Sequence, residues 1–410
     1  MPKDKRVVIT GMGLRTPVGN TLADFAQSLK DGVSGVVQVP EWAEIGNLRC
    51  RVGGACRDVG EDAVPRKYRR TMGRVALLAA VATDDAIEDS GISRDLVASD
   101  RCGVSFGSTA GSCSTQETVL RRLWDTMSTQ GMSASSYLHY MSHTCAANVA
   151  MMFSVQGPVV APCTACVSGS QGVGYGYEQI LLGRCDAMLC GGAEELHYMD
   201  AVVFDVMRAT STKYNDEPHR TPRPFDAARD GLVVSEGAGA LVLEDYGHAK
   251  ARDARIYAEI LGYGNNCDGH HLTTAQPDGI AAAIRRALAD ANMPADDIAY
   301  ICAHATATSI GDVAEAEATH RIFGDRVPVS SLKGHMGHTL GAAGAVESIA
   351  TILMMREKFV APTLNLENPD TRCAPLGHVM GPPRNLDFST AMNNNFAFGG
   401  LNTSLIFSLV

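Results

Sequence analysis

The chain has 410 residues, of which 45% are hydrophobic and 20% are charged, so it is long enough to bury a large core. Its formal net charge of −10 argues against a general nucleic-acid binder, though not against a local basic patch. No apolar run approaches the roughly 20 residues that span a bilayer, and the first residues lack the apolar segment of a signal peptide. We therefore expect a cytoplasmic protein with no membrane or nucleic-acid partner.

Twelve cysteines are spread along the chain without regular spacing. This pattern is typical of reduced thiols in the cytosol and not of a disulfide framework. No C-x-x-C pair is repeated downstream, so the cysteine spacing predicts no metal site.

The first predicted strand, residues 6–13, ends in glycines. Thr16 stands where a dinucleotide-binding fingerprint needs its third glycine, and the chain has no P-loop, so nucleotide binding is weakly supported. An amphipathic helix is expected over residues 75–89, a short buried strand over 102–107, and inserted helices and loops over 112–150. A basic run precedes that helix and is either a solvated face or a docking site for an acidic partner: Arg66, Lys67, Arg69, Arg70 and Arg74.

A thiol at a strand-to-helix turn is the strongest chemical feature. An apolar run over residues 159–161 leads to Cys163-Thr-Ala-Cys166, and a glycine-rich segment then becomes a helix. A cysteine at a helix N-terminus lies at the positive end of the helix dipole, which favours the nucleophilic thiolate. Each glycine costs the helix roughly 0.5–1 kcal/mol relative to alanine, so the glycines indicate a close packing partner.

Two other interpretations of Cys166 stay open at this point. Cys163 and Cys166 form a C-x-x-C pair, although no thioredoxin-like βαβ unit surrounds them. A plain buried cysteine is the usual role of an isolated thiol. Two histidines in equally distinctive settings favour a reactive site over both.

Both histidines are predicted to lie at the ends of elements. His304 follows an apolar strand, and His338 precedes a Gly/Ala-rich helix. The carboxyl end of a strand is where α/β folds place functional groups. His335 and His338 also read as a His-x-x-His metal pair, but no third ligand is apparent nearby and Lys333 would repel a cation.

The second part of the chain repeats the first. The first part ends with expected strands at 186–193 and 239–244 and a loop at 223–231. In the second part, a helix near 287–293 leads to a strand at 300–304, just as the helix at 75–89 leads to the strand at 102–107. The helix at 341–350 repeats the small residues that follow Cys166. This order predicts a duplicated α/β unit, residues 1–250 and 251–410, with largely parallel sheets covered by helices. We expect residues 393–402 to form a loop in which paired glycines allow close ligand approach, before a last strand at 404–410.

These segments resemble the elongating β-ketoacyl-[acyl-carrier-protein] synthases of the thiolase superfamily. The resemblance covers nearly the whole chain and includes residues 7–13, 164–166, 223–231, 304–312, 333–347 and 396–402, in the family's order. It implies a five-layered αβαβα fold of two similar halves, acyl carrier protein as partner, and a homodimer or a heterodimer with a related subunit. The reaction that the resemblance implies requires no metal and no cofactor.

The resemblance also implies roles for individual residues. Cys166 matches the acyl-accepting nucleophile, and His304 and His338 match the histidine pair. The backbone N–H groups of Cys166 and Phe398 would form the oxyanion hole, with Phe398 also gating the acyl pocket. Supporting positions are Lys333, Glu347 and Thr306, and the basic run at 66–74 becomes the expected carrier-protein docking site.

Four positions depart from the family pattern. Ala305, Gly334, Ala397 and Leu401 stand where the family generally has glycine, serine, glycine and threonine. Because the catalytic side chains are all present, these departures point to an altered gate or substrate profile. The alternatives are a ketosynthase subunit that works with a cysteine-less partner and a non-condensing carrier-binding module. A degradative thiolase, with its Cys/His/Cys set, fits less well.

Overall fold

A computed structural model describes residues 5–410 of the chain. Its first half contains a five-stranded sheet in the order β5-β4-β6-β7-β1. The strands and principal helices of this half are β1 (Val7–Arg15), α3 (Arg74–Ser90), β4 (Cys102–Gly107), α7 (Thr144–Phe153), β5 (Val159–Val160), α8 (Ser168–Leu181), β6 (Ala187–Glu194) and β7 (Gly237–Asp245).

The second half repeats this arrangement in the order β10-β9-β14-β15-β8, with β12 added at its edge. Its elements are β8 (Ala258–Cys267), α11 (Pro277–Ala291), β9 (Ile301–Cys302), α12 (Gly311–Phe323), β10 (Pro328–Ser330), α14 (Ala343–Glu357), β12 (Gly377–His378), β14 (Thr390–Ala397) and β15 (Leu401–Ser408). Each pair of corresponding strands has the same relative direction, so the internal repeat is confirmed.

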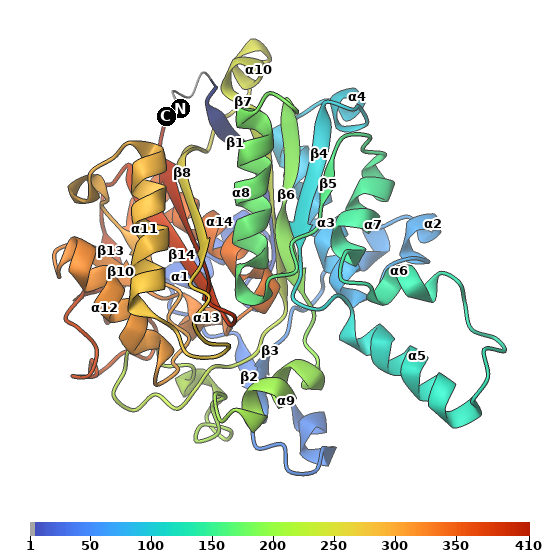
Figure 1. Cartoon of the computed structure of the whole chain (residues 1–410), viewed down its shortest axis with the longest axis horizontal. Helices are drawn as coiled ribbons and strands as arrows, with labels where there is room; N and C mark the ends of the chain where they lie inside the picture. Colours follow the sequence, from blue (N-terminus) through green and yellow to red (C-terminus); the bar gives the residue numbers. More distant parts are fainter. Residues whose placement is uncertain (1–4) are drawn as a thin grey trace.

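The elements form five layers (Figure 1). Helices α3 and α7 cover the outer face of the first sheet, and α11 and α12 cover the outer face of the second. Helices α8 and α14 lie between the two sheets and contact each other as well as strands of both halves. The sheets join edge to edge where β1 pairs with β8. This is the predicted αβαβα fold.

The sheets are mixed, so the prediction of largely parallel sheets is wrong. Pairs β6–β7 and β14–β15 are antiparallel, as are β7–β1 and β15–β8. In each half only the strands near β4 or β9 are connected by crossover helices and are parallel. The final strand of each half pairs antiparallel with its predecessor, through a tight turn between β14 and β15 and through a long connection between β6 and β7.

Strand β14 corrects a second prediction, because residues 393–397 belong to a strand and not to a loop. Asn393, Asn394 and Asn395 are fully buried, which their sequence did not suggest. Their side chains are paired: Asn393 Nδ2 donates to the Gly344 carbonyl, Asn395 Nδ2 to Glu347, and Asn394 Oδ1 accepts from Ser404 Oγ. The glycine pair occupies the tight turn between β14 and β15.

The glycines of α8 confirm the predicted close packing. A Cβ added at Gly172 would lie 2.5 Å from the Gly191 carbonyl oxygen of β6, and one at Gly176 would lie 2.1 Å from Cys190 Sγ. Helix α14 is buried on all sides from Ala343 to Met355. Small residues therefore allow the two central helices to lie between the sheets.

The remaining elements surround this framework. They are α1 (Leu22–Lys30), β2 (Val36–Gln38), β3 (Val52–Gly54), α2 (Arg66–Arg69), α4 (Arg94–Val97), α5 (Cys113–Thr126), α6 (Ser136–Tyr140), α9 (Tyr198–Val206), α10 (Tyr246–Ala251), α13 (Lys333–Met336), β11 (Phe359–Val360) and β13 (Arg384–Asn385), with short 3₁₀ turns between them. Helix α5 projects from the body (Figure 1). Between residues 5 and 410, none of the helices combines the length and the apolar character that crossing a membrane requires.

Candidate active site

Cys166 lies where the chain passes from β5 into the central helix α8, as the sequence predicted. A 3₁₀ turn over Ala165–Val167 separates strand from helix, and the thiol is buried. Ala165 has a φ of 51°, in the left-handed region that costs a residue with a Cβ roughly 1–2 kcal/mol. A strained turn next to a reactive side chain is a recurrent feature of functional sites.

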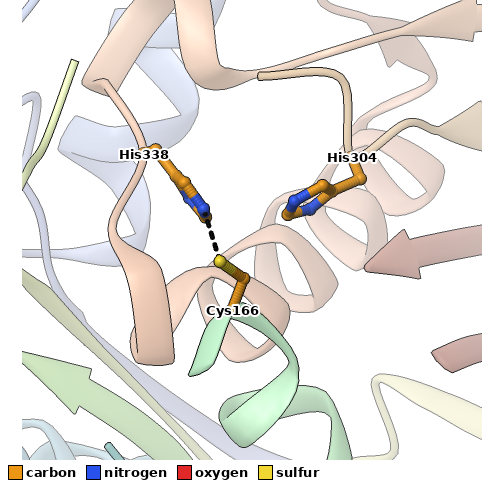
Figure 2. A group of neighbouring side chains, drawn as sticks. All are labelled: Cys166, His304 and His338. Carbon is orange, nitrogen blue, oxygen red and sulfur yellow. Dashed lines mark hydrogen bonds between the residues drawn. The ribbon is translucent and has the colours of Figure 1, made fainter. Parts of the chain in front are cut away.

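His338 contacts the thiol directly. Its Nε2 lies 3.0 Å from Cys166 Sγ (Figure 2). The backbone N–H of Leu340 donates to His338 Nδ1 at 3.3 Å, so Nδ1 is an acceptor and the ring proton belongs on Nε2. The Nε2–H group therefore points at the sulfur and can stabilise negative charge there.

His304 completes the group. Like His338 it comes from the second half of the chain, and it lies two residues beyond β9. Its ring centroid lies 5.1 Å from that of His338, with the rings nearly perpendicular at 83°. A nitrogen from each ring and the sulfur all lie within 4.8 Å of one another. His304 Nδ1 is buried without a hydrogen-bond partner, so it is free to bond a substrate group.

Burial dominates the protonation of these groups. It lowers the pKa of both His304 and His338 well below the usual value, and the nearby Lys333 ammonium lowers them further. Both imidazoles are therefore neutral at physiological pH. Burial also raises the pKa of Cys166 to about 12, while Lys333 lowers it. Burial thus opposes the expected preference for the thiolate, and only local donors and charges offset it.

Lys333 is anchored below the histidines. Its ammonium contacts Glu347 Oε1 at 2.6 Å, and Asn395 Nδ2 donates to Glu347 Oε2 at 2.7 Å. All three side chains are buried. A buried ion pair of this kind keeps a positive charge beside the site, and that charge also opposes metal binding by the Cys166, His304 and His338 group, whose spacing would otherwise permit it.

A carboxyl that the sequence analysis missed holds the His304 loop. Glu315 of α12 accepts the backbone N–H groups of His304 at 2.8 Å and of Ala305 at 2.6 Å. Burial raises its pKa to about 8. The signal available in the sequence was an acidic residue among the alanines of an otherwise buried helix face, eleven residues after His304.

The three reactive side chains open into a cavity of about 400 Å³. Phe204, Phe396, Phe398 and Thr306 also line it, together with Ala305, where the family resemblance leads us to expect glycine. The rings of Phe204 and Phe398 lie 5.6 Å apart. Apolar walls around a few polar groups are typical of a small-molecule site.

The turn after Phe398 owes its shape to two glycines. Gly399 and Gly400 have φ values of 83° and 72°. Ala397 and Leu401, both departures from the family pattern, pair across the base of this turn. The fourth departure is forced by packing, because a Cβ at Gly334 would lie 2.5 Å from the Leu364 carbonyl oxygen.

One sequence alternative is wrong in the structure. His335 lies outside the site, with its ring nitrogens against the carbonyls of Val33 and Pro362, so it does not form a metal pair with His338. Cys163 and Cys166 are both free thiols with separate partners, because Cys163 Sγ contacts the Ser142 carbonyl and Cys166 Sγ contacts His338.

The basic run has two kinds of members. Arg69 pairs with Asp62 at 3.0 Å, and the half-buried Arg74 pairs with Glu236 at 2.8 Å. Arg66, Lys67 and Arg70 are exposed.

Comparison with known sequences defines the class of protein. Residues 4–249 match the family described as beta-ketoacyl synthase, N-terminal domain, and residues 257–367 match beta-ketoacyl synthase, C-terminal domain. The chain therefore belongs to the beta-ketoacyl synthase family and is an acyltransferase of the condensing type.

Individual relatives cover almost the full length. The chain is 37% identical to 3-oxoacyl-[acyl-carrier-protein] synthase 1 of Haemophilus influenzae, over 98% of each chain. It is 38% identical to 3-oxoacyl-[acyl-carrier-protein] synthase 2 of Vibrio cholerae, over 98% of this chain and 99% of the relative.

Solved structures of similar proteins agree with the fold. A beta-ketoacyl synthase from Burkholderia phymatum has a TM-score of 0.96 at 48% identity, over 99% of this chain and 100% of that one. The ishigamide ketosynthase/chain length factor has a TM-score of 0.92 at 30% identity, over 99% of each chain. A type II polyketide ketosynthase in complex with its acyl-carrier protein has a TM-score of 0.90 at 28% identity, over 99% of each chain.

Proposed function

We propose that this enzyme extends an acyl chain by two carbons in a two-step reaction on acyl carrier protein. Cys166 first takes the acyl group, and a malonyl group on a second carrier then condenses with it. The observation that carries this proposal is the 3.0 Å contact between His338 Nε2 and Cys166 Sγ, with a second neutral imidazole beside it.

In the first step the Cys166 sulfur attacks the carbonyl carbon of an acyl thioester. A bond forms between that carbon and Cys166 Sγ, the bond to the carrier's sulfur breaks, and the thiol proton passes to the departing carrier thiolate. The Nε2–H of His338 stabilises the charged sulfur as it forms. The Lys333 ammonium lowers the pKa of the thiol in the same direction.

In the second step the malonyl carboxylate leaves as carbon dioxide, and its bonding electrons form an enolate at the thioester. His304 and His338, neutral and therefore able to donate, stabilise the enolate oxygen. The carbanion carbon then bonds to the acyl carbon, and the Cys166 thiolate leaves. The product is a 3-oxoacyl thioester on the carrier.

We assign the oxyanion hole to the backbone N–H groups of Cys166 and Phe398. The left-handed backbone of Gly399 and Gly400 supports this role, since it allows the chain after Phe398 to turn sharply beside the cavity. Loss of one such donor typically costs roughly 2.7–4 kcal/mol of transition-state stabilisation. Thr306 is assigned a supporting role at the cavity wall.

The carrier protein is proposed to dock on α2 and the residue that follows it. Arg66, Lys67 and Arg70 are exposed cations, whereas Arg69 and Arg74 are held in ion pairs and contribute a weaker field. A carrier is expected because the sequence relatives are named for the acyl carrier protein and one similar ketosynthase was solved with its own carrier. The family resemblance implies that the carrier protein is acidic, which suits a patch of exposed cations.

We further propose a homodimer built around the edge strand β5. This strand lies at the outer edge of the first sheet. Val159 on it is 49% exposed, and Met151 of the neighbouring α7 is 41% exposed. An unpaired apolar edge is a liability unless a second chain covers it. A ketosynthase subunit that pairs with a related chain is the second candidate, favoured by the similarity to a ketosynthase/chain length factor pair.

We propose a cytoplasmic location. Residues 5–410 contain every cysteine of the chain, and all twelve are free thiols there, as expected in a reducing compartment.

Replacing Cys166 with alanine tests the proposed nucleophile. Intact mass is measured after the protein is mixed with acyl-carrier proteins. The wild type should gain the mass of one acyl group, Cys166→Ala should gain none, and Cys163→Ala is the matched control that should behave as wild type. Full condensation by Cys166→Ala would contradict the assignment, whereas intact carrier binding without acyl transfer by the wild type would favour a non-condensing module.

A further inference from the structure

Two buried carboxyl groups, neither of them among the residues that line the cavity, are used by no step of the reaction. Glu194 ends β6 and is fully buried, and Asp200 of α9 is 7% exposed. Glu194 Oε1 and Asp200 Oδ2 are both buried without a hydrogen-bond partner. An unsatisfied buried polar atom costs roughly 1–3 kcal/mol, so each of these oxygens lacks a partner that its burial favours.

The other oxygens of this acidic pair are engaged. Glu194 Oε2 accepts the backbone N–H of Thr109 at 2.8 Å and that of Gly341 at 3.1 Å, three residues after His338. Asp200 Oδ1 lies 3.8 Å from Cys113 Sγ. One oxygen of each carboxyl thus fixes its position and leaves the second available.

The neighbouring Glu195 shows what a purely structural carboxyl looks like here. Both of its oxygens are engaged at the start of α5, with the Ser114 backbone N–H at 2.6 Å and Ser112 Oγ at 3.0 Å. Holding α5 in place therefore accounts for Glu195. It does not account for the free oxygens of Glu194 and Asp200.

Helix geometry connects Asp200 to the acyl cavity. Asp200 and Phe204 are four residues apart on α9 and therefore share one face of the helix. Phe204 lines the cavity together with Cys166, and its ring packs against Phe398. Asp200 thus lies one helical turn from an aromatic side chain of the cavity wall, and Glu194 lies close enough to Asp200 for that charge to raise the Glu194 pKa.

The protonation of the pair suits a ligand with a hydroxyl group. Burial raises the pKa of Glu194 to about 8, and the Asp200 charge raises it further. Burial also raises the pKa of Asp200 to about 7, and there the charge of Glu195 adds to the shift. Near neutral pH the pair therefore holds at least one proton, so it offers both a donor and an acceptor. A hydroxyl group can bond to both, whereas a saturated alkyl chain would leave both unpaired.

We propose that Glu194 and Asp200 form a polar subsite behind Phe204 and Phe398 that selects acyl groups bearing a hydroxyl group away from the thioester. This inference rests on the proposed transfer of an acyl group to Cys166. Asp200 determines specificity in it and takes no part in the bond-making steps.

The test compares acylation rates of Cys166 with matched carrier-bound chains. Each pair has the same length, with and without a terminal hydroxyl group, across a ladder of alkyl and aryl-terminated chains, and the mass gain of the intact enzyme is followed over time. At the best length the wild type should prefer the hydroxylated member by at least about tenfold, because a site built to bond a hydroxyl group rejects its analogue.

Variants separate the subsite from folding. Asp200→Leu should remove most of that preference and raise the rate with the plain alkyl chain, while Asp200→Asn, which keeps the shape and hydrogen-bonding groups, should retain part of it. Met199→Leu, on the exposed side of the same helix, is the matched control and should retain the wild-type ratio.

Two outcomes would overturn the inference in distinguishable ways. Equal rates for the two members of every pair, with Cys166 still acylated, would contradict the subsite and leave the proposed function intact. No acylation by any chain would contradict the proposed function and the subsite with it.

Discussion

His338 acts on Cys166 through one contact, and its effect on the thiol can be separated from that of His304. Removal of the Nε2–H donor should raise the pKa of the thiol, because a hydrogen bond to a charged group is worth roughly 1.5–3 kcal/mol. At neutral pH, His338→Ala should therefore slow alkylation of Cys166 by iodoacetamide by about tenfold or more, since 1.4 kcal/mol corresponds to a factor of ten.

His304→Ala is the matched comparison, because the hydrogen bond to the sulfur comes from His338, while the His304 ring lies beside His338 with 5.1 Å between the ring centroids. It should slow alkylation less than His338→Ala does. Mass spectrometry of the alkylated enzyme measures both rates. Equal slowing by the two variants would contradict a specific role of His338.

The protonation of the histidines predicts a pH dependence. Burial and the Lys333 charge lower the pKa of His304 and His338 well below 6.5, so the neutral form persists as pH falls through that value. The rate of malonyl decarboxylation by acylated enzyme should therefore show no loss centred near pH 6.5. Stopped-flow release of carbon dioxide across pH 5.5–8 measures this. A half-maximal rate near pH 6.5 would place an ordinary histidine in the reaction.

At the scale of single elements, α8 contains glycines because of close packing, although glycine has a low helix propensity. Gly172→Ala would gain up to about 1 kcal/mol of propensity. It would also place a methyl group against the backbone carbonyls of Gly191 and Ser105, at 2.5 and 2.9 Å, and such overpacking typically costs 1–3 kcal/mol. We expect net destabilisation and a lower melting temperature.

Gly247→Ala provides the control, because Gly247 is an exposed position of α10. There the added methyl group meets only the Asp245 side chain at 3.1 Å, so propensity should prevail and stability should stay equal or rise slightly. A stabilised Gly172→Ala variant would show that α8 is not tightly packed between the sheets.

The sequence predicted the elements that carry the catalytic groups because each depends on local chemistry. Cys166 at a strand-to-helix turn, His304 after a strand and His338 before a small-residue helix all lie where expected. The buried strand at Asn393–Asn395 could not be predicted, since the Asn393 and Asn395 amide groups donate to partners as distant in sequence as Gly344 and Glu347. Glu315 escaped for the same reason, because its partners are backbone groups of another loop.

For the whole molecule, the sequence repeat predicted the duplicated α/β unit, and the family resemblance implied its five layers, but the repeat did not predict the strand directions. The order of elements reveals the duplication, whereas the antiparallel return of β7 and β15 depends on pairing between segments far apart in the chain. We propose the division at 250/251 as the boundary of the two repeats. The β1–β8 pair and the two central helices join these repeats into one core.

The proposed dimer makes a prediction about assembly. Val159→Arg places a charge on the exposed edge strand β5 and should convert the dimer to a monomer in sedimentation velocity experiments. Leu182→Arg, at the exposed C-terminal end of α8, should leave the assembly unchanged. A wild-type protein that is monomeric until a related chain is added would favour the two-subunit ketosynthase.

The most direct test of the two-step condensation is a single turnover. Enzyme acylated on Cys166 is mixed with malonyl-carrier protein that is labelled at the carboxyl carbon of its malonyl group. Carbon dioxide and the carrier-bound product are measured together by mass spectrometry. The proposed mechanism should yield one labelled carbon dioxide and one 3-oxoacyl chain, two carbons longer, for each acyl group that leaves Cys166. Loss of the acyl group without carbon dioxide, or carbon dioxide without a longer chain, would contradict it.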